Sequence, residues 1–330
     1  MYIPSASLPP VTLASPGGAR GTLTVLFFHR VFARVDPMMP GEPTAKSFDT
    51  LLGWVQSQFN VLPLAEGVRR LANHSLPPAA AAITFDDGYR DNLDVAAPLL
   101  QRRGLPATFF IASGFLDGGI MFNDVVIECM RRCPMEEILL SNLDIASLSL
   151  RTWPERGRAA GIVLRALKYL PFKQRADAVQ RLPIHCRVEL PNDLMLTSEQ
   201  VRAMAAQGFE IGAHTDHHPI LARVSDDMAR AEITRGRNRL EAIAERSVRL
   251  FAFPNGRWGL DFDQRHCDMA KACGFDAAFS TEPSVCHAGS HLWCLPRFTP
   301  WDRTELKFRL RLLTWQRRRA EQTPAPARQP

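Results

Sequence analysis

Two adjacent carboxylates, Asp86 and Asp87, follow the apolar run at residues 79–85 and precede Gly88. A buried strand that ends in two acidic residues and a glycine places both charges at one end of a core. Two carboxylates this close disfavour ionisation of both unless a cation or a strong donor compensates. The pair therefore predicts a positive partner elsewhere in the chain.

A second segment that could do chemistry, residues 214–218, reads His-Thr-Asp-His-His. At the start of a helix, His214 could face one cation together with His217 or His218. Two imidazoles and a carboxylate, with positions left for water, form a metal site of the catalytic type. The alternative is an exposed histidine cluster on a loop. We expect these histidines at the same end of the core as the two aspartates. We therefore favour a metal site in which one aspartate is a ligand and its neighbour is a base.

Short apolar segments that end in polar residues recur along the chain, and helical patterns follow them. We expect strands at 23–28, 79–85, 107–112, 209–213, 249–253 and 275–280, and helices at about 92–103, 197–208 and 225–245. Six such units indicate an α/β fold with a parallel sheet, and their number suits a closed or nearly closed barrel. Because barrel enzymes carry their sites at the carboxyl ends of the strands, these ends predict one mouth formed by His29, Asp86, Asp87, His214, His218, Asn255 and Gly256.

Residues from about 116 to 195 interrupt this alternation with mainly helical, arginine-rich patterns. We expect them to form an inserted helical subdomain or lid within a single barrel domain at 21–302. Residues 1–20 are expected to be a flexible N-terminus. Residues 303–330 are expected to be a basic C-terminal segment with a disordered end. Within it, residues 306–312 alternate apolar and basic, which fits a last strand or a helix held on both sides.

Composition narrows the class of protein. The chain has 330 residues, of which 46% are hydrophobic and 22% charged, as in ordinary globular proteins. No apolar run is long enough for a transmembrane helix. Much of the net charge of +6 lies in the last thirty residues, which indicates a basic tail and no nucleic-acid groove. That tail predicts at most weak association with an anionic membrane surface.

The absence of a visible secretory signal and the odd number of cysteines, seven, favour reduced thiols. We therefore expect a cytoplasmic location, at most peripheral to the inner face of the membrane. Cys129 and Cys133 lie one helical turn apart. We interpret them as apolar helix positions, since zinc sites usually show two close ligand pairs.

The chain resembles the polysaccharide deacetylase family (carbohydrate esterase family 4, the NodB-like fold), which includes chitooligosaccharide, chitin and peptidoglycan deacetylases. The matching segments are residues 84–89, 214–219 and 251–256, with weaker matches at 26–31 and 295–298. The resemblance implies a distorted (β/α) barrel with fewer than eight strands. It also implies a metal-dependent hydrolase that removes acetyl groups from N-acetylated sugars of an oligo- or polysaccharide, in cell-surface glycan biosynthesis or modification.

The resemblance also assigns roles at the metal. Asp86 matches the catalytic base, and Asp87, His214 and His218 match the ligands of a divalent metal. Zn²⁺ is the first expectation, although such sites accept several divalent ions. The family's spacing selects His218 over His217. Water activated by the metal would attack the acetyl carbonyl with Asp86 as base.

Further residues match the substrate cleft. The turn Pro254, Asn255 and Gly256 matches the segment that lines the cleft, where the Asn255 N–H would donate to the oxyanion of the tetrahedral intermediate. We place Tyr89, which ends the first motif, in the same group.

Two departures from the family pattern affect the groups around Asp86. Ala252 stands where many members carry an arginine that pairs with the catalytic aspartate, and Arg297 could supply the charge instead. Residues 295–297 stand where many members carry a histidine that protonates the leaving amine. His29 is our first candidate for this acid, followed by His287 and His291; an equal alternative is that His29 orients Asp86.

Two other functions fit the same residues. One is a metal-dependent amidase or imidase with a non-sugar substrate, because a barrel fold does not fix the substrate. The other is a non-catalytic carbohydrate-binding relative, which the two departures would suit. The complete set Asp86, Asp87, His214 and His218 argues against the second, since a binding module needs no base.

Overall fold

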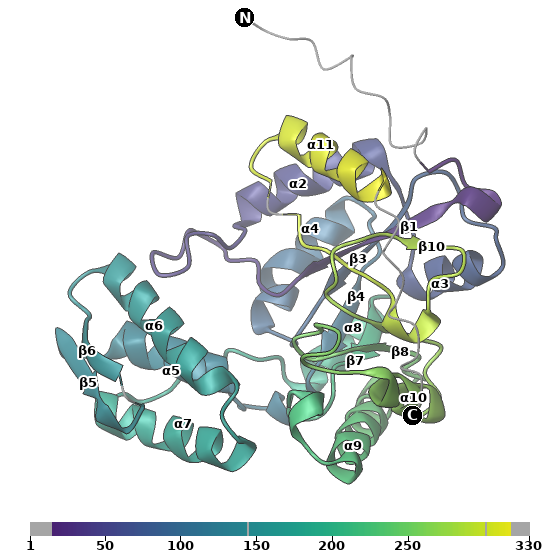
Figure 1. The fold of residues 1–330 in the computed structure, drawn as a ribbon. Helices are drawn as coiled ribbons and strands as arrows, with labels where there is room; N and C mark the ends of the chain where they lie inside the picture. The colour runs from purple at the N-terminus through teal and green to yellow at the C-terminus, as the bar shows by residue number, and fades with distance from the viewer. Residues whose placement is uncertain (1–14, 144, 301, 318–330) are drawn as a thin grey trace, which may run out of the picture.

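The computed structural model describes residues 15–143, 145–300 and 302–317. Within them, six parallel strands form the wall of a barrel in the order β1 (Thr22–Phe28), β3 (Ala80–Phe85), β4 (Thr108–Ile111), β7 (Glu210–Ala213), β8 (Leu250–Ala252) and β9 (Ala277–Phe279). Two short strands extend the sheet: β2 (Asn60–Val61) pairs with β3, and β10 (Cys286–His287) runs antiparallel to β1. The expected barrel with fewer than eight strands in its wall is confirmed (Figure 1).

The barrel is closed by residues 295–298, which lie between its two edge strands. On one side, the Leu295 N–H donates to the Ala278 carbonyl of β9 at 2.8 Å. On the other side, the Phe298 N–H donates to the Val25 carbonyl of β1 at 3.1 Å, and the Phe27 N–H donates to the Phe298 carbonyl at 3.2 Å. This segment therefore carries Arg297 to the ring of strands.

Alternate residues of the strands pack on opposite faces of the wall. In β3, Ala80 and Ala82 belong to the buried cluster that contains Phe110 and Phe279, while Ala81 and Ile83 belong to the larger cluster shared with the outer helices. This is the two-residue period of a strand. A narrow barrel leaves little room inside, which explains the alanines on the inner face.

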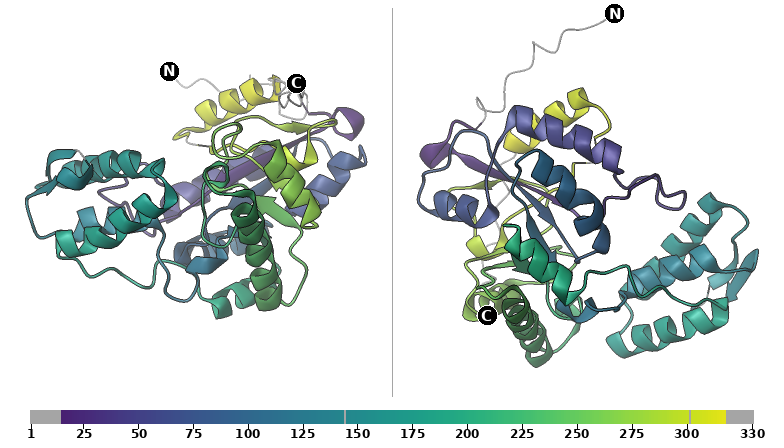
Figure 2. Two further views of the ribbon diagram at one scale, coloured as in Figure 1. Left: turned by 60° about the horizontal axis from the view of Figure 1, so that its bottom comes forward. Right: turned by 180° about the vertical axis from the view of Figure 1, so that it is seen from behind.

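The outer helices surround the wall (Figure 2). They are α2 (Ala45–Gln58), α3 (Leu64–Ala72), α4 (Ala97–Arg102), α8 (Ser198–Ala206), α9 (Asp226–Ala244), α10 (Gln264–Ala272) and α11 (Glu305–Arg317). Short helical turns are η2 (Gly18–Arg20), η3 (Asn92–Ala96), η4 (Ser113–Phe115), η5 (Ser141–Leu143), η6 (Leu221–Arg223) and η7 (Leu292–Cys294). The helix expected at 92–103 begins as the π-turn η3, because Pro98 has no N–H for a regular helical bond in the next turn.

The insertion forms a separate lobe beside the barrel (Figures 1 and 2). It contains α5 (Phe122–Arg132), α6 (Trp153–Lys168), α7 (Phe172–Cys186) and an antiparallel pair of strands, β5 (Glu137–Leu140) and β6 (Ile145–Ser149). The prediction of a mainly helical insertion therefore missed this hairpin. The lobe has its own buried cluster, in which Cys129 and Cys133 are packed as apolar residues.

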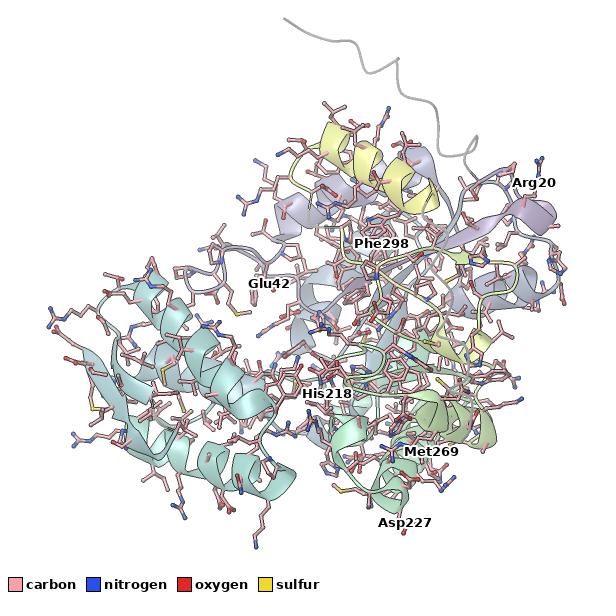
Figure 3. The ribbon with its side chains drawn as sticks, in the orientation of Figure 1. Arg20, Glu42, His218, Asp227, Met269 and Phe298 are labelled. Carbon is pink, nitrogen blue, oxygen red and sulfur yellow. The ribbon has the colours of Figure 1, made fainter. Side chains whose placement is uncertain are left out.

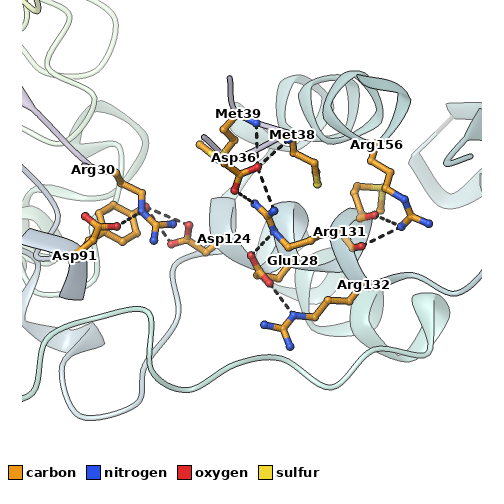
Figure 4. Close-up of polar contacts among 12 residues, drawn as sticks. Arg30, Asp36, Met38, Met39, Asp91, Asp124, Glu128, Arg131, Arg132 and Arg156 are labelled. Carbon is orange, nitrogen blue, oxygen red and sulfur yellow. Dashed lines mark hydrogen bonds and ion pairs between the residues drawn. The ribbon is translucent and has the colours of Figure 1, made fainter. Parts of the chain in front are cut away.

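The loop after β1 ties this lobe to the barrel (Figure 4). The Asp36 carboxylate accepts two hydrogen bonds from the Arg131 guanidinium of α5, at 2.7 and 3.2 Å. The same guanidinium donates to Glu128 at 2.9 Å, and Met38 is buried in the lobe's cluster. The loop thus fixes α5 beside the carboxyl ends of the barrel strands.

Two expectations concern the ends of the described chain. Residues 15–20 lie within the segment expected to be flexible, yet Ser15 is buried and its hydroxyl accepts from the Thr22 N–H at 3.1 Å. Residues 306–312 lie in helix α11, which settles the choice between strand and helix. The disorder expected at the far end falls on residues 318–330, outside the described residues. No helix of the described part is long and apolar enough to cross a membrane.

Candidate active site

The alternation of β3 decides where the two aspartates lie. Thr84 and Asp86 share the inner face of the strand, whereas Phe85 packs outward against the helices. Asp87 then adopts a left-handed backbone, with φ of 76°, and Gly88 follows with φ of 89°. Two consecutive residues with positive φ turn the chain sharply at the strand end. The turn separates the two carboxylates into different surroundings.

Asp86 forms a buried ion pair with Arg297. The guanidinium donates to both carboxylate oxygens, at 2.7 and 2.8 Å, and the two side chains are 2% and 0% exposed. A third bond runs from Arg297 Nε to the Ser280 carbonyl at 3.2 Å. Such a two-bond arrangement fixes both the distance and the plane of the carboxylate. The structure thus places Arg297 where we expected the missing arginine charge.

Aromatic rings surround this guanidinium inside the barrel. Its central carbon lies 4.9 Å from the ring centre of Phe27 and 5.2 Å from that of Phe110. Burial, the largest influence, raises the pKa of Asp86, but Arg297 and then His214 act in the opposite direction and the net pKa lies below its usual value. Asp86 is therefore ionised at neutral pH.

Asp87, His214 and His218 meet at the mouth of the barrel. The Asp87 Oδ1 atom lies 3.5 Å from His214 Nε2 and 3.4 Å from His218 Nε2. The imidazole of His214 is oriented by its other nitrogen, because Nδ1 lies 2.7 Å from the Ala252 carbonyl. Figure 3 shows His218 at the side of the barrel that faces the lobe.

These three side chains fit a divalent cation. Asp87 Oδ1 is buried and has no hydrogen-bond partner among the described residues. Burial, opposed by Asp87, lowers the pKa of His218 to about 3, so this imidazole is neutral and can act as a ligand. Burial also lowers the pKa of His214, but the nearby carboxylates of Asp87 and Asp86 outweigh this and the net pKa is raised; the pocket favours a positive charge. One carboxylate and two imidazoles suit Zn²⁺ and other divalent ions.

The turn that follows β8 borders the mouth. Asn255 and Gly256 have φ of 60° and 72°, and the turn is fixed by Thr281, whose hydroxyl donates to the Asn255 carbonyl at 2.8 Å. Pro254 is buried at its start. No backbone hydrogen bond from the Asn255 N–H is found among the described residues, and its role toward an oxyanion stays a prediction.

Tyr89 connects the site to the lobe. Its hydroxyl donates to the Asp124 carboxylate of α5 at 3.1 Å and accepts from Asn123 at 3.2 Å, and its ring lies 4.4 Å below the Arg30 guanidinium. A direct contact of Tyr89 with substrate stays a prediction. Asp124 could not be identified from the sequence, because nothing near it in the chain distinguishes it from other acidic residues of a first helical turn.

A model of the polysaccharide deacetylase family matches residues 73–144 and 168–278. The match covers more than half of the chain and includes both aspartates, the histidine motif and the turn after β8. The chain belongs to the polysaccharide deacetylase family.

This deacetylase is also similar to individual proteins. The protein YxkH of Bacillus subtilis (strain 168) is 19% identical over 277 residues, which span 83% of this chain and 70% of that protein. Among solved structures, the Streptococcus pyogenes deacetylase PplD, in complex with acetate, has a TM-score of 0.60 at 17% identity, covering 90% of this chain and 99% of the other. IcaB from Ammonifex degensii has a TM-score of 0.57 at 17% identity, covering 90% and 97%. At such identities the structures show the shared fold.

The family match leaves parts of this deacetylase uncovered. Residues 145–167 fall between the two matched segments and contain β6 and most of α6 of the lobe. The match also begins after β1 and stops before the closing segment, so it covers neither His29 nor Arg297. The roles of these two residues rest on the geometry of this chain.

The three histidines considered as general acid lie in different places in the deacetylase. His29 follows β1 at the mouth and is exposed. It lowers the pKa of Asp86, with a smaller effect than burial, Arg297 or His214. Both oxygens of Asp86 are held by Arg297, so the structure gives no contact by which His29 orients this carboxylate. His287 pairs with Thr22 at the opposite end of β1, and His291 lies beside Trp293. Only His29 of these three lies at the mouth.

Proposed function

We propose that this chain hydrolyses the N-acetyl groups of an oligo- or polysaccharide in a reaction that depends on a divalent cation. The observation that carries the proposal is the separation of the two aspartates: Asp86 is ionised against Arg297, and Asp87 faces His214 and His218. This arrangement supports Asp86 as a base beside a set of cation ligands at one mouth. The relative solved with acetate was bound to the product that this reaction would release.

Each of the residues at the mouth would have a separate role in this reaction. A cation held by Asp87, His214 and His218 would supply a Lewis acid and lower the pKa of water. Asp86 would accept the proton of the attacking water, and Arg297 would keep that carboxylate ionised and in place. The Asn255 N–H would donate to the oxyanion.

The amine that leaves needs a proton. His29 is our candidate for the donor because it lies exposed at the mouth beside the two aspartates. His29→Gln should lower turnover while leaving bound metal unchanged. An unchanged rate would remove His29 from this role.

Acetate release from N-acetylglucosamine oligomers tests the proposal. The purified protein should release acetate, lose this activity after treatment with a chelator, and regain it when Zn²⁺ is added. Activity that survives complete removal of metal would contradict the cation dependence. Hydrolysis of a cyclic imide without release of acetate would point to the amidase class, and binding of oligomers without any hydrolysis would point to a non-catalytic relative.

The outer face of α11 supports weak attachment to an anionic membrane surface as a further part of the proposal. Leu306 and Leu310 are 59% and 47% exposed, and Lys307 is exposed beside them. Exposed leucines next to cations suit the boundary between lipid headgroups and acyl chains. In flotation with anionic vesicles, the Leu306→Gln/Leu310→Gln variant should float less than the parent protein, and equal flotation would contradict the attachment.

A further inference from the structure

The loop that carries the two histidine ligands has an unfavourable backbone. Thr215 and His218 have φ of 63° and 51°, in the left-handed region that favours glycine. Residues with side chains keep this conformation where neighbouring groups hold it in place. The geometry of the ligands therefore depends on what contacts the loop.

The two imidazoles are oriented in different ways. His214 has the usual arrangement of a metal-binding histidine, in which the second ring nitrogen bonds to a carbonyl, here that of Ala252 at 2.7 Å. The second ring nitrogen of His218 is buried and has no hydrogen-bond partner among the described residues. The His218 N–H donates to the Thr215 hydroxyl at 3.0 Å. His218 is thus oriented through the backbone of its loop.

Glu232 of α9 binds this backbone directly before His218. Its carboxylate accepts from the His217 N–H at 2.6 Å and lies 3.0 Å from the His217 ring nitrogen Nδ1. The side chain is 2% exposed, and its charge is offset by Arg235 at 2.8 Å. A buried carboxylate with a charge-assisted bond to an N–H holds that N–H firmly.

Further contacts hold the loop on both sides. The Ser113 hydroxyl donates to the Asp216 carboxylate at 2.7 Å, and the Gly114 N–H donates to the Asp216 carbonyl at 2.8 Å. On the side of α9, a Cβ added at Gly236 would lie 2.6 Å from the carbonyl carbon of Thr215. Helix α9 therefore touches the loop backbone where Glu232 binds it.

We propose that Glu232 is a positioning residue, which holds the backbone at His217 and thereby directs His218 toward Asp87. The inference rests on the proposed function, since it takes Asp87, His214 and His218 as the cation ligands. Glu232 itself also forms a cluster with Asp216 and His217. The Arg235 guanidinium pairs with both carboxylates of that cluster, at 2.8 and 3.5 Å, so the cation there is a side chain.

Metal affinity measures this role without any assay of activity. Glu232→Ala should raise the Kd for Zn²⁺, determined by competition with a chromogenic chelator, by about 10- to 100-fold. Glu232→Gln should raise it several-fold, because an amide oxygen can still accept from the His217 N–H while the second contact is lost. Glu241→Ala is the matched control: Glu241 lies on the same helix and bonds to the Val248 N–H and Arg237, and its loss should leave the Kd unchanged.

A double variant separates positioning from a general loss of structure. If Glu232 acts through His218, then Glu232→Ala should add nothing to the loss of affinity already caused by His218→Ala. Additive losses, or a Kd unchanged in both Glu232 variants, would overturn the inference. If the alanine variant does not fold, Glu232→Gln alone decides, and a wild-type Kd in that variant counts against the role. A wild-type protein that binds no metal would instead contradict the proposed function.

Discussion

Arg297 and Asp86 show how a residue distant in sequence can take a role in the family's site. Ala252 occupies the position at which the resemblance leads one to expect an arginine. The closing segment of the barrel, residues 295–298, brings Arg297 to Asp86 in its place. The acidic strand end and the histidine motif, together with the family resemblance that selects His218, were sufficient to predict that Asp87, His214 and His218 lie together. The contacts of Glu232 with His217 and of Asp124 with Tyr89 could not be predicted. Each joins residues far apart in the sequence, and no pattern in the adjacent residues distinguishes Glu232 or Asp124.

Removal of Arg297 should destabilise the protein in a manner that depends on pH. Arg297→Met leaves a buried carboxylate without its partner, which costs about 3–5 kcal/mol at pH 7. Burial raises the pKa of Asp86, and Arg297 holds it below its usual value. The wild-type pair therefore adds stability above the unfolded pKa of the carboxyl, and this stability is lost as the pH falls. The difference in unfolding free energy between wild type and variant should therefore shrink toward pH 4.

Urea unfolding at pH 4.5 and pH 7 measures this difference. Arg249→Met is a suitable control, since Arg249 forms an exposed ion pair with Asp276 and its loss should cost about 1 kcal/mol or less. Equal losses of unfolding free energy in the two variants would contradict a special role of the buried pair.

At the scale of elements, the lobe departs most from its predicted structure. The region from about 116 to 195 is predicted to be mainly helical, yet within it buried Ile138 and Leu140 alternate with exposed neighbours in β5. This two-residue period is the signal of a strand, but it is short and lies within a helical region. The connection between lobe and barrel, through Asp36 and Asp124, depends on tertiary contacts that no local pattern indicates.

The contact between α5 and the barrel should weaken as the pH rises. Burial, reinforced by Asp87 and opposed by Arg30, raises the pKa of Asp124 to about 7; Tyr89 and Glu128 also face this carboxyl. A raised pKa adds stability below the unfolded value, near 4, and this is lost as the pH rises through 7. Asp124→Asn keeps a neutral partner for Tyr89 at every pH. The free energy of unfolding of the variant, relative to that of wild type, should therefore rise from pH 5 to pH 8, by at most about 4 kcal/mol.

Urea unfolding of Asp124→Asn and wild type at the two pH values tests this expectation. The protection of α5 amides against hydrogen exchange, corrected for the intrinsic exchange rate at each pH, should also be lower in wild type at pH 8 than at pH 5, and the variant should show a smaller decrease. A variant that loses the same stability at both pH values would show that the Asp124 carboxyl does not change its protonation there.

For the whole molecule, the repeated strand and helix pattern predicted the barrel, whereas its closure and last helix needed the structure. Residues 295–298 are too few and too irregular in pattern to be identified as the segment that joins both edges. The alternation at 306–312 resembles a strand, but in helix α11 it places apolar residues on two opposite faces. Phe308 and Leu312 face the core, and Leu306 and Leu310 face solvent.

Two substitutions in α11 test this division. Phe308 is fully buried and its ring centre lies 5.9 Å from that of Trp54 in α2, so Phe308→Ala should lower the free energy of unfolding by about 3–5 kcal/mol. Leu310→Ala, two residues away on the exposed face, should change it by about 0.5 kcal/mol or less. Thermal and urea unfolding compare the two, and similar effects would mean that α11 does not pack in this orientation.

The central claim is that Asp86 is the base and that Asp87, His214 and His218 hold the cation. It is tested most directly by measuring acetate release and bound metal in the same preparations of wild type, Asp86→Asn and His218→Ala. Asp86→Asn should retain the metal of wild type and lose acetate release by about 100-fold or more, while His218→Ala should lose both. Acetate release at the wild-type rate by Asp86→Asn, with its metal intact, would contradict the account.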